Sequence, residues 1–273
     1  TLNHWDIPQI FLEKGGWTNR DCIQHFLDYS DIVSSEFGDR VKYWVTHNEP
    51  WVISNCGYKE GIHAPGENNV YESLLVNHNL LLSHGQAVPI IRGNSVDSKV
   101  GIVLNLTPGM PASQSDADQK ASKLFNQFFN DWFLDPLYGG SYPTEVSDDW
   151  IKKGVIDSID FVKEGDYNII SVPTDFLGIN YYSRGIIRSE DIPESDNAPI
   201  ELIAGDKTDF DWEVYPNGLR DLLINVNTRY KPGSIYITEN GCAYDYPKSS
   251  DGQINDTRRV EYLESHISAC MEA

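Results

Sequence analysis

Short, apolar, β-rich runs alternate with longer stretches of helical periodicity along this chain of 273 residues. This alternation is typical of βα units, which build parallel sheets. The sequence predicts five strands, at residues 1–5, 43–49, 99–106, 175–182 and 234–239. We therefore predict an α/β fold of five parallel βα units that follow chain order, with the first and last strands at the edges of the sheet.

Helical spacing of apolar residues predicts the elements between the strands. The expected long helices cover residues 23–37, 71–92, 116–132, 216–230 and 256–272, and short helices are expected near 146–154 and 161–164. Residues 189–211 are polar and acidic with little periodicity, which predicts a loop. Because no repeat or linker interrupts this series, we predict that residues 1–273 form a single domain. A (β/α)8 barrel typically needs roughly 250 residues, so the length permits a barrel, but five strands predict only part of one.

Charge and cysteine content limit the classes of partner and compartment. Acidic residues outnumber basic ones 41 to 21, which argues against nucleic acid or an anionic membrane surface as a partner. No stretch approaches the roughly 20 apolar residues of a membrane span. The four cysteines are scattered without metal-ligand spacing, which predicts reduced thiols in a cytoplasmic compartment. Because the chain opens inside a predicted strand, we expect its true start to lie upstream, and this leaves a signal peptide open.

Two of the predicted strands end at a glutamate. Glu49 precedes Pro50, which disfavours the helical region for the residue before it, and Glu239 precedes Asn240 and Gly241, which end the run. One such glutamate alone is ordinarily an exposed turn residue. However, the carboxyl ends of strands are where barrels of βα units place their chemistry. Two carboxyl groups that face each other across a sugar-sized gap are the minimal equipment for cleaving a glycosidic bond.

Other strand ends carry groups able to hold hydroxyls. An isolated His or Tyr in such a place is more often a core residue, but here four of the five strands end in polar or aromatic side chains. The candidates for binding a sugar are His4, Trp5, Asn48, Trp51, Asn180 and Tyr182. Amides and ring donors can bond sugar hydroxyls, and indole rings can stack on sugar C–H faces.

Five segments together resemble the family-1 glycoside hydrolases, the retaining β-glucosidases and their relatives. They are Thr1-Leu2-Asn3-His4-Trp5-Asp6-Ile7-Pro8-Gln9, Thr46-His47-Asn48-Glu49-Pro50-Trp51, Gly178-Ile179-Asn180-Tyr181-Tyr182, Trp212-Glu213-Val214-Tyr215-Pro216 and Tyr236-Ile237-Thr238-Glu239-Asn240-Gly241. The resemblance implies a TIM (β/α)8 barrel, here incomplete, with strands three to seven present. Two positions depart from the family pattern: Asn3 stands where an aromatic residue is usual, and His47 where an apolar one is common.

The resemblance also implies a role for each candidate. Glu49 would be the acid/base and Glu239 the nucleophile, while Tyr182 would hydrogen-bond the nucleophile and Trp51 would lie toward the leaving group. The sugar would be held by His4, Trp5, Asn48 and Asn180.

The implied reaction is hydrolysis of a small-molecule β-glycoside or oligosaccharide by double displacement, without a metal or organic cofactor. Because residue 49 is a glutamate, the thioglucosidase branch of the family is disfavoured. Two alternatives stay open: a sugar-binding pseudoenzyme, and a truncated barrel that is inactive by itself. The substrate alternatives are β-galactosides and 6-phospho-β-glucosides.

Overall fold

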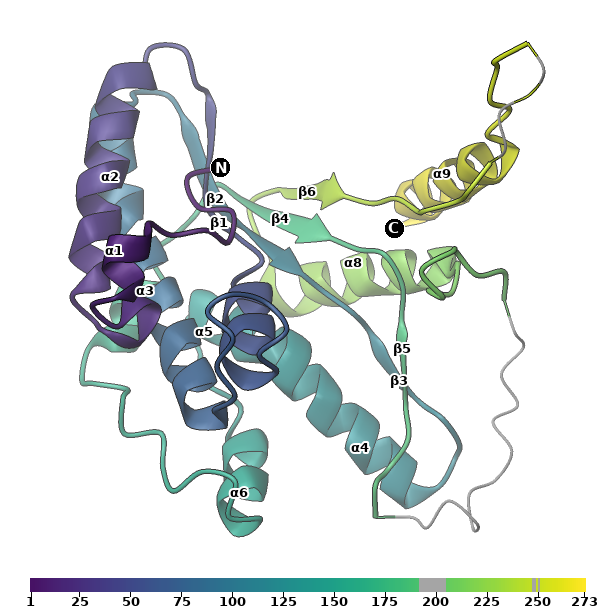
Figure 1. The fold of residues 1–273 in the computed structure, drawn as a ribbon, viewed down its shortest axis with the longest axis horizontal. Coiled ribbons are helices and arrows are strands. Elements are labelled where there is room, and N and C mark those ends of the chain that lie inside the picture. Colours follow the sequence, from purple (N-terminus) through teal and green to yellow (C-terminus); the bar gives the residue numbers. More distant parts are fainter. Residues whose placement is uncertain (192–204, 247–248, 250) are drawn as a thin grey trace. The chain divides into compact units, whose positions relative to one another are not determined.

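The computed structural model describes residues 1–191, 205–246, 249 and 251–273 (Figure 1). The chain divides into two units, and each draws on several stretches of sequence. The first unit contains Thr1–Asn105, Asp131–Ile179 and Pro232–Tyr236. The second takes its described residues from Leu106–Asn130, Asn180–Lys231 and Ile237–Ala273.

A four-stranded sheet organises the first unit, in the order β1-β2-β4-β6. The strands are β1 (Tyr43–Asn48), β2 (Lys99–Asn105), β4 (Phe176–Asn180) and β6 (Ile235–Glu239), and the ends of β4 and β6 belong to the second unit. β1 and β2 are parallel. The other strands also run parallel, because the Asp175 amide bonds to Val100 and the Leu177 amide to Ser234, in step along each pair. These four strands and their order confirm the prediction, including β6 as an edge strand.

The first predicted strand, residues 1–5, is wrong as a regular strand. The segment lies beside β1, but it forms only an isolated parallel bridge between Asn3 and His47. The Leu2 and Asn3 amides donate to Val45 and Thr46. Trp5 then turns away with a φ of 77°, so the extended stretch is too short for a ladder.

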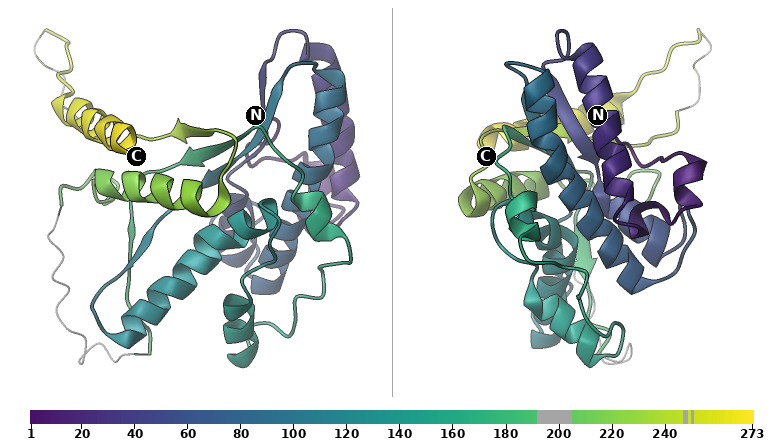
Figure 2. Two further views of the ribbon diagram at one scale, coloured as in Figure 1. Left: turned by 180° about the vertical axis from the view of Figure 1, so that it is seen from behind. Right: turned by 90° about the vertical axis from the view of Figure 1, so that its left-hand side faces the viewer.

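The helices of the first unit pack on β1 and β2 and on one another (Figure 2). Helix α3 (Val70–Asn94) contacts both strands, and α2 (Cys22–Phe37) packs along α3. The side chain of Asn69 caps α3 by accepting from the Glu72 amide. The unit also contains α1 (Gln9–Leu12), α5 (Trp132–Leu137), α6 (Thr144–Lys152) and α7 (Asp166–Ile170). The predicted helix at residues 161–164 is wrong: those residues form turns, because Gly165 adopts a φ of 88° directly before α7.

A largely buried cluster around Asp166 joins α3, α7 and the loops that contain Arg20 and Tyr142. Asp166 bonds to Arg20 at 2.5 Å and to His78 at 2.9 Å, and the other ring nitrogen of His78 bonds to the hydroxyl of Tyr142. Burial alone would raise the pKa of Asp166, but the hydrogen bonds from Arg20 and His78 bring it down to about 2. Asp166 therefore stays ionised inside the fold and holds α7 to α3.

The described part of the second unit is built around α4 (Asp116–Asn126), two further helices and a small sheet. Helix α8 (Pro216–Tyr230) packs on α9 (Thr257–Glu272), as both ribbons show in Figure 2. Both helices match their predicted positions. A parallel two-stranded sheet, β3 (Gly109–Pro111) with β5 (Gly185–Ile187), was not expected from the sequence, because each strand has only three residues.

The helix predicted at residues 116–132 is interrupted. It is α-helical over α4 (Asp116–Asn126), becomes a π-helix at Gln127–Asp131, and continues as α5. A second π-helix, Val52–Lys59, follows β1 and was not predicted. The expected loop at residues 189–211 lies partly outside the described residues, at positions 192–204.

Candidate active site

Glu49 leaves the end of β1 through an irregular piece of backbone. Val45 pairs with Gly101 but Asn48 pairs with Val103, so β1 has one residue more than β2 in this interval, which is a β-bulge. The Glu49 amide donates to Val103, and its φ is 49°, in the left-handed region. We predicted that Pro50 would keep Glu49 out of the right-handed helical region, and it does so, but the residue is left-handed and not extended. Such strain in a non-glycine residue is typical of functional sites.

The residues around Glu49 combine burial with access. Glu49 itself is only 6% exposed. Pro50 opens a turn of helix that carries Trp51, half-buried, and passes into the π-helix Val52–Lys59. Burial, with the nearby charges of Glu60 and Glu49, raises the pKa of the Cys56 thiol in that helix to about 11. The Cys56 thiol therefore stays protonated near neutral pH.

Three of the predicted sugar-binding residues meet in the first unit. The side-chain amide of Asn48 lies 3.3 Å from Nε2 of His4, and the ring of Trp5 lies 5.2 Å from the ring of His4. Asn48 is buried, whereas His4 and Trp5 are exposed. The His4 ring and the Trp5 indole can thus meet a ligand from solvent, with Asn48 fixing the His4 ring from behind.

Behind this loop, Asn3 and His47 form a buried pair that sequence reasoning noticed only as two departures from a pattern. Nδ1 of His47 lies 3.2 Å from Oδ1 of Asn3, and Nδ2 of Asn3 donates to the carbonyl of Asp6. Because Oδ1 of Asn3 can only accept, Nδ1 of His47 carries the proton, and Nε2 lies 2.7 Å from the Ser83 hydroxyl. The pair thereby holds both ends of the turn that contains His4 and Trp5.

In the second unit, the end of β6 is bonded to the end of β4. The Tyr182 hydroxyl donates to Oε2 of Glu239 at 2.5 Å, and the Thr238 hydroxyl donates to Oδ1 of Asn180 at 2.6 Å. The first of these bonds has a carboxylate acceptor, and charge-assisted bonds of this length are strong. The predicted residues Asn180, Tyr182 and Glu239 are therefore brought together here, and one carboxylate oxygen of Glu239 is engaged.

Tyr262 on α9 supports the same strand ends and was not predicted. Its hydroxyl donates to the carbonyl of Tyr182 and accepts from the side-chain amide of Asn240, which also bonds to the carbonyl of Tyr181. Its ring stacks on His266. Tyr262 lies 23 residues beyond Glu239 in a helical pattern, where a tyrosine is ordinarily a core residue. The sequence therefore gives no indication of this contact.

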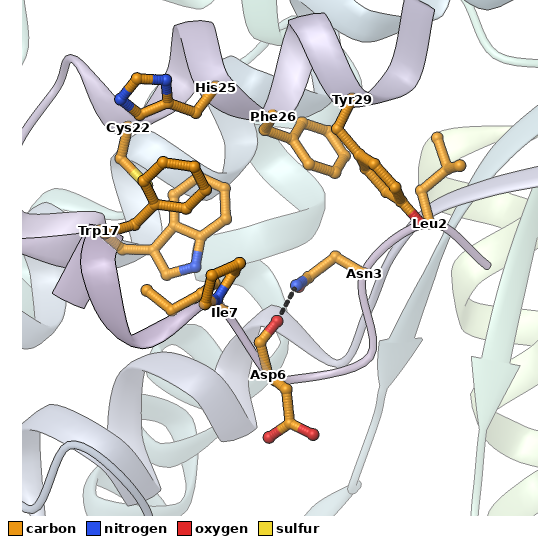
Figure 3. Close-up of a pocket in the computed structure, with 11 residues that line it drawn as sticks. Leu2, Asn3, Asp6, Ile7, Trp17, Cys22, His25, Phe26 and Tyr29 are labelled. Carbon is orange, nitrogen blue, oxygen red and sulfur yellow. Dashed lines mark hydrogen bonds between the residues drawn. The ribbon is translucent and has the colours of Figure 1, made fainter. Parts of the chain in front are cut away.

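The first unit contains a cavity of about 300 Å³ next to the turn between Asn3 and Asp6 (Figure 3). Figure 3 shows the Asn3 amide directed at the Asp6 carbonyl in its wall. The remaining lining is mainly apolar, and none of the predicted sugar-binding residues of this unit lines it: the walls are Leu2, Asn3, Asp6, Ile7, Pro8, Phe11, Trp17, Cys22, His25, Phe26 and Tyr29. The cavity is therefore distinct from the surface formed by His4, Trp5 and Asn48.

The described residues contain neither a metal-binding cluster nor a membrane-spanning helix. No three His, Cys, Asp or Glu side chains within them gather as a metal site. Likewise, in the part of the chain that the structure describes, no helix has the length and apolar character needed to cross a bilayer.

Known proteins match this chain over its whole length. The family model described as Glycosyl hydrolase family 1 matches residues 1–273. "Beta-glucosidase A" of Acetivibrio thermocellus is 42% identical over 275 residues, covering 100% of this chain and 61% of the relative, and "Beta-glucosidase A" of Thermotoga maritima is 38% identical over 280 residues, covering 100% and 60%. A solved β-glucosidase from Exiguobacterium marinum superposes with a TM-score of 0.90 at 37% identity, covering 98% of this chain and 60% of that one.

This chain thus spans about three-fifths of the length of the relatives it matches. The parallel α/β sheet and the motifs around Glu49 and Glu239 agree with those matches. The chain belongs to glycosyl hydrolase family 1, and hence to the TIM-barrel class of α/β folds.

Proposed function

We propose that residues 1–273 form one incomplete (β/α)8 catalytic domain. The N-terminal segment and strands β1, β2, β4 and β6 would correspond to strands three to seven of the barrel. Their parallel direction and chain order support this assignment. A cluster of aromatic rings supports it further: Phe176, Tyr43 and Tyr236 pack on one another, and the two tyrosines are 58% and 43% exposed. Rings that line one face of a parallel sheet are expected in the interior of a closed barrel.

The proposed activity is hydrolysis of β-glycosidic bonds of the β-glucosidase type, with retention of configuration. The single observation that carries this proposal is the 2.5 Å hydrogen bond from Tyr182 to Glu239 at the end of β6. It engages one oxygen of a strand-end carboxylate and leaves the other free to serve as a nucleophile. A structural glutamate at a turn would need no such directed partner.

Each site residue has a proposed role. Glu239 attacks the anomeric carbon to form a glycosyl-enzyme ester, and Glu49 protonates the departing oxygen. Glu49 then removes a proton from water, which attacks the same carbon and releases the sugar with Glu239 restored. His4, Trp5, Asn48 and Asn180 bind the sugar, and Trp51 lies toward the leaving group.

The proposed substrate is a small β-glycoside or oligosaccharide. Relatives that match this chain are named β-glucosidase, 1,4-beta-D-glucan glucohydrolase and 6-phospho-beta-glucosidase, and the Thermotoga maritima β-glucosidase has been solved with glucoimidazole. We rank β-glucosides first, with β-galactosides and 6-phospho-β-glucosides as alternatives. Because all four cysteines are free thiols, we place the protein in a reducing, cytoplasmic compartment.

The test compares two glutamate variants in a chimera in which residues 1–273 replace the matching region of Acetivibrio thermocellus β-glucosidase A. The parent chimera is expected to hydrolyse an aryl β-glucoside with saturable kinetics. Glu239→Ala should abolish turnover. Glu49→Ala should still form the glycosyl-enzyme from a substrate with a good leaving group and should be rescued by azide, yielding a β-glycosyl azide, because only departure of a poor leaving group needs the acid.

The outcomes separate the candidate functions. Azide rescue of Glu239→Ala instead of Glu49→Ala would reverse the two roles. A chimera that binds the glucoside without hydrolysing it would identify a sugar-binding pseudoenzyme. The 273-residue chain by itself is expected to hydrolyse the glucoside poorly, and full activity of that chain would refute the proposal of an incomplete barrel.

A further inference from the structure

Two segments of the second unit are locked together beside the proposed nucleophile. Arg184 follows β4, and Glu213 precedes α8. The Arg184 guanidinium donates two hydrogen bonds to the Glu213 carboxylate, from Nε to Oε2 at 2.7 Å and from Nη2 to Oε1 at 2.8 Å. The two side chains are only 13% and 16% exposed. The guanidinium also lies 3.7 Å from the centre of the Tyr215 ring. This is a bidentate, partly buried ion pair with a cation–π contact, the geometry in which an ion pair holds its elements rigidly.

Backbone contacts reinforce this ion pair on both sides. The hydroxyl of Ser183 donates to the carbonyl of Glu213 at 2.8 Å, and the hydroxyl of Tyr181 donates to the carbonyl of Tyr215 at 2.6 Å. A Cβ at Gly218 would lie 2.3 Å from the Tyr181 hydroxyl, so the start of α8 has room for that contact only as glycine. Residues 181–184 and 213–215 are thereby fixed to each other.

This connection reaches Glu239 through two aromatic rings. Trp212, next to Glu213 in sequence, places its ring 5.3 Å from that of Tyr182. Tyr182 in turn bonds to Oε2 of Glu239. Trp212 is itself 43% exposed, so the packing around its ring cannot hold it alone. The segment that carries it must be held by its neighbours: Thr208 bonds to both the amide and the carbonyl of Trp212, and the next residue, Glu213, is anchored to Arg184.

We propose that Arg184 and Glu213 are positioning residues for the Glu239 nucleophile: their bidentate pair holds Trp212 against Tyr182 and so keeps the Tyr182 hydroxyl on Oε2. This inference rests on the proposed function, in which Oε1 of Glu239 attacks the sugar. Misplacing a reacting group by about 1 Å can reduce the rate 10²-fold, so partial loosening is expected to reduce kcat by about tenfold. KM should change little, because neither residue touches the sugar in this assignment.

The test is a double-mutant cycle in the chimera described above. Glu213→Gln should lower kcat about tenfold in the parent and less than twofold in a Tyr182→Phe background, because the pair acts through the Tyr182 hydroxyl. Asp221→Asn is the matched control, since it removes an exposed ion pair with Arg220 on α8 of the same unit and should leave kcat unchanged. Equal factors in the two backgrounds, or an unchanged kcat, would overturn the inference. An inactive parent chimera would instead refute the proposed function.

A second measurement does not depend on activity. The amides of Tyr181 and Val214 donate to the backbone carbonyls of Glu239 and Asp206. In the 273-residue chain, Glu213→Gln should speed hydrogen exchange at these two amides, whereas Asp221→Asn should not. If exchange at both amides matches the parent, the pair does not hold these segments and the inference fails. Loss of protection throughout the chain would point to a merely structural pair and would likewise overturn it.

Discussion

Two buried histidines make the stability of this chain sensitive to mild acid. His47 and His84 are fully buried in the first unit, and the hydroxyl of Thr46 bonds to Nδ1 of His84 at 2.7 Å. Burial, aided by the charge of Arg92, lowers the pKa of His84 to about 3. Burial and His84 likewise lower the pKa of His47 well below its ordinary value. The His84 ring is therefore neutral in the folded chain at pH 5, whereas the unfolded chain binds a proton there with an ordinary pKa of about 6.5. The pKa of His47 is shifted in the same direction.

The sign and size of the effect follow from proton linkage. Each of these pKa values is lower in the folded state, so the stabilisation is present above pH 6.5 and is lost as the pH falls toward the folded value. In that window each histidine reduces the free energy of unfolding by about 1.4 kcal/mol per pH unit. For His84 the loss between pH 7 and pH 5 is about 2 kcal/mol, and His47 adds to it in the same direction.

Urea unfolding of the chain, followed by tryptophan fluorescence at pH 7, 6 and 5, measures this loss. His84→Asn provides the comparison, because an amide can replace Nδ1 as a partner of Thr46 but does not titrate. The variant should be less stable at pH 7, yet its free energy of unfolding should fall less steeply with pH, by about 1.4 kcal/mol per unit between pH 6 and pH 5. The other titratable groups respond to pH in the same way in the parent chain and in His84→Asn, so their effect cancels when the two slopes are compared. Identical slopes for the chain and the variant would refute the assignment of a buried neutral His84.

Two further predictions concern packing in the first unit and use the same unfolding assay. Asp166→Asn should lower the free energy of unfolding by about 3–5 kcal/mol, because it leaves Arg20 without its carboxylate in a largely buried cluster. A change below 1 kcal/mol would show that the cluster does not contribute to stability. Gly85→Ala should lower the free energy of unfolding by about 1–3 kcal/mol, because its Cβ would lie 2.0 Å from the Ile169 carbonyl oxygen. Gly93→Ala on the same helix meets nothing within 4 Å and should raise the free energy of unfolding by about 0.5–1 kcal/mol. Equal effects of the two alanines would contradict this close contact of α3 with α7.

The strands were predictable where burial on both faces leaves an uninterrupted apolar run. β2 is buried from Val100 to Leu104, and its β-branched and apolar residues have no other plausible environment. Residues 1–5 failed as a strand because an extended segment becomes a ladder only if it stays in register beyond one bridge, and the turn at Trp5 prevents this. The π-helix after Glu49 was missed because periodicity alone does not separate a π-helical turn from an irregular one.

For the candidate site, the sequence nominated residues and one support, the hydrogen bond of Tyr182 to Glu239, but not the other contacts around them. Strand-end position identified Glu49 and Glu239, since the carboxyl ends of parallel strands lie at one edge of the sheet. Two pairs near the site were hidden by sequence separation: Arg184 and Glu213 are 29 residues apart, and Asn3 and His47 are 44 apart. Such pairs become visible only when backbone topology brings the two segments together, and no local pattern records that.

The left-handed backbone of Glu49 means that this position is occupied against the fold's own preference. A side chain at a φ of 49° costs of order 1–3 kcal/mol, which glycine would avoid and asparagine would reduce. Selection for heat resistance alone would consequently favour variants in which Glu49 is replaced, and these variants would lack the carboxylate. Thermostability screens on this chain therefore need an activity criterion at every round.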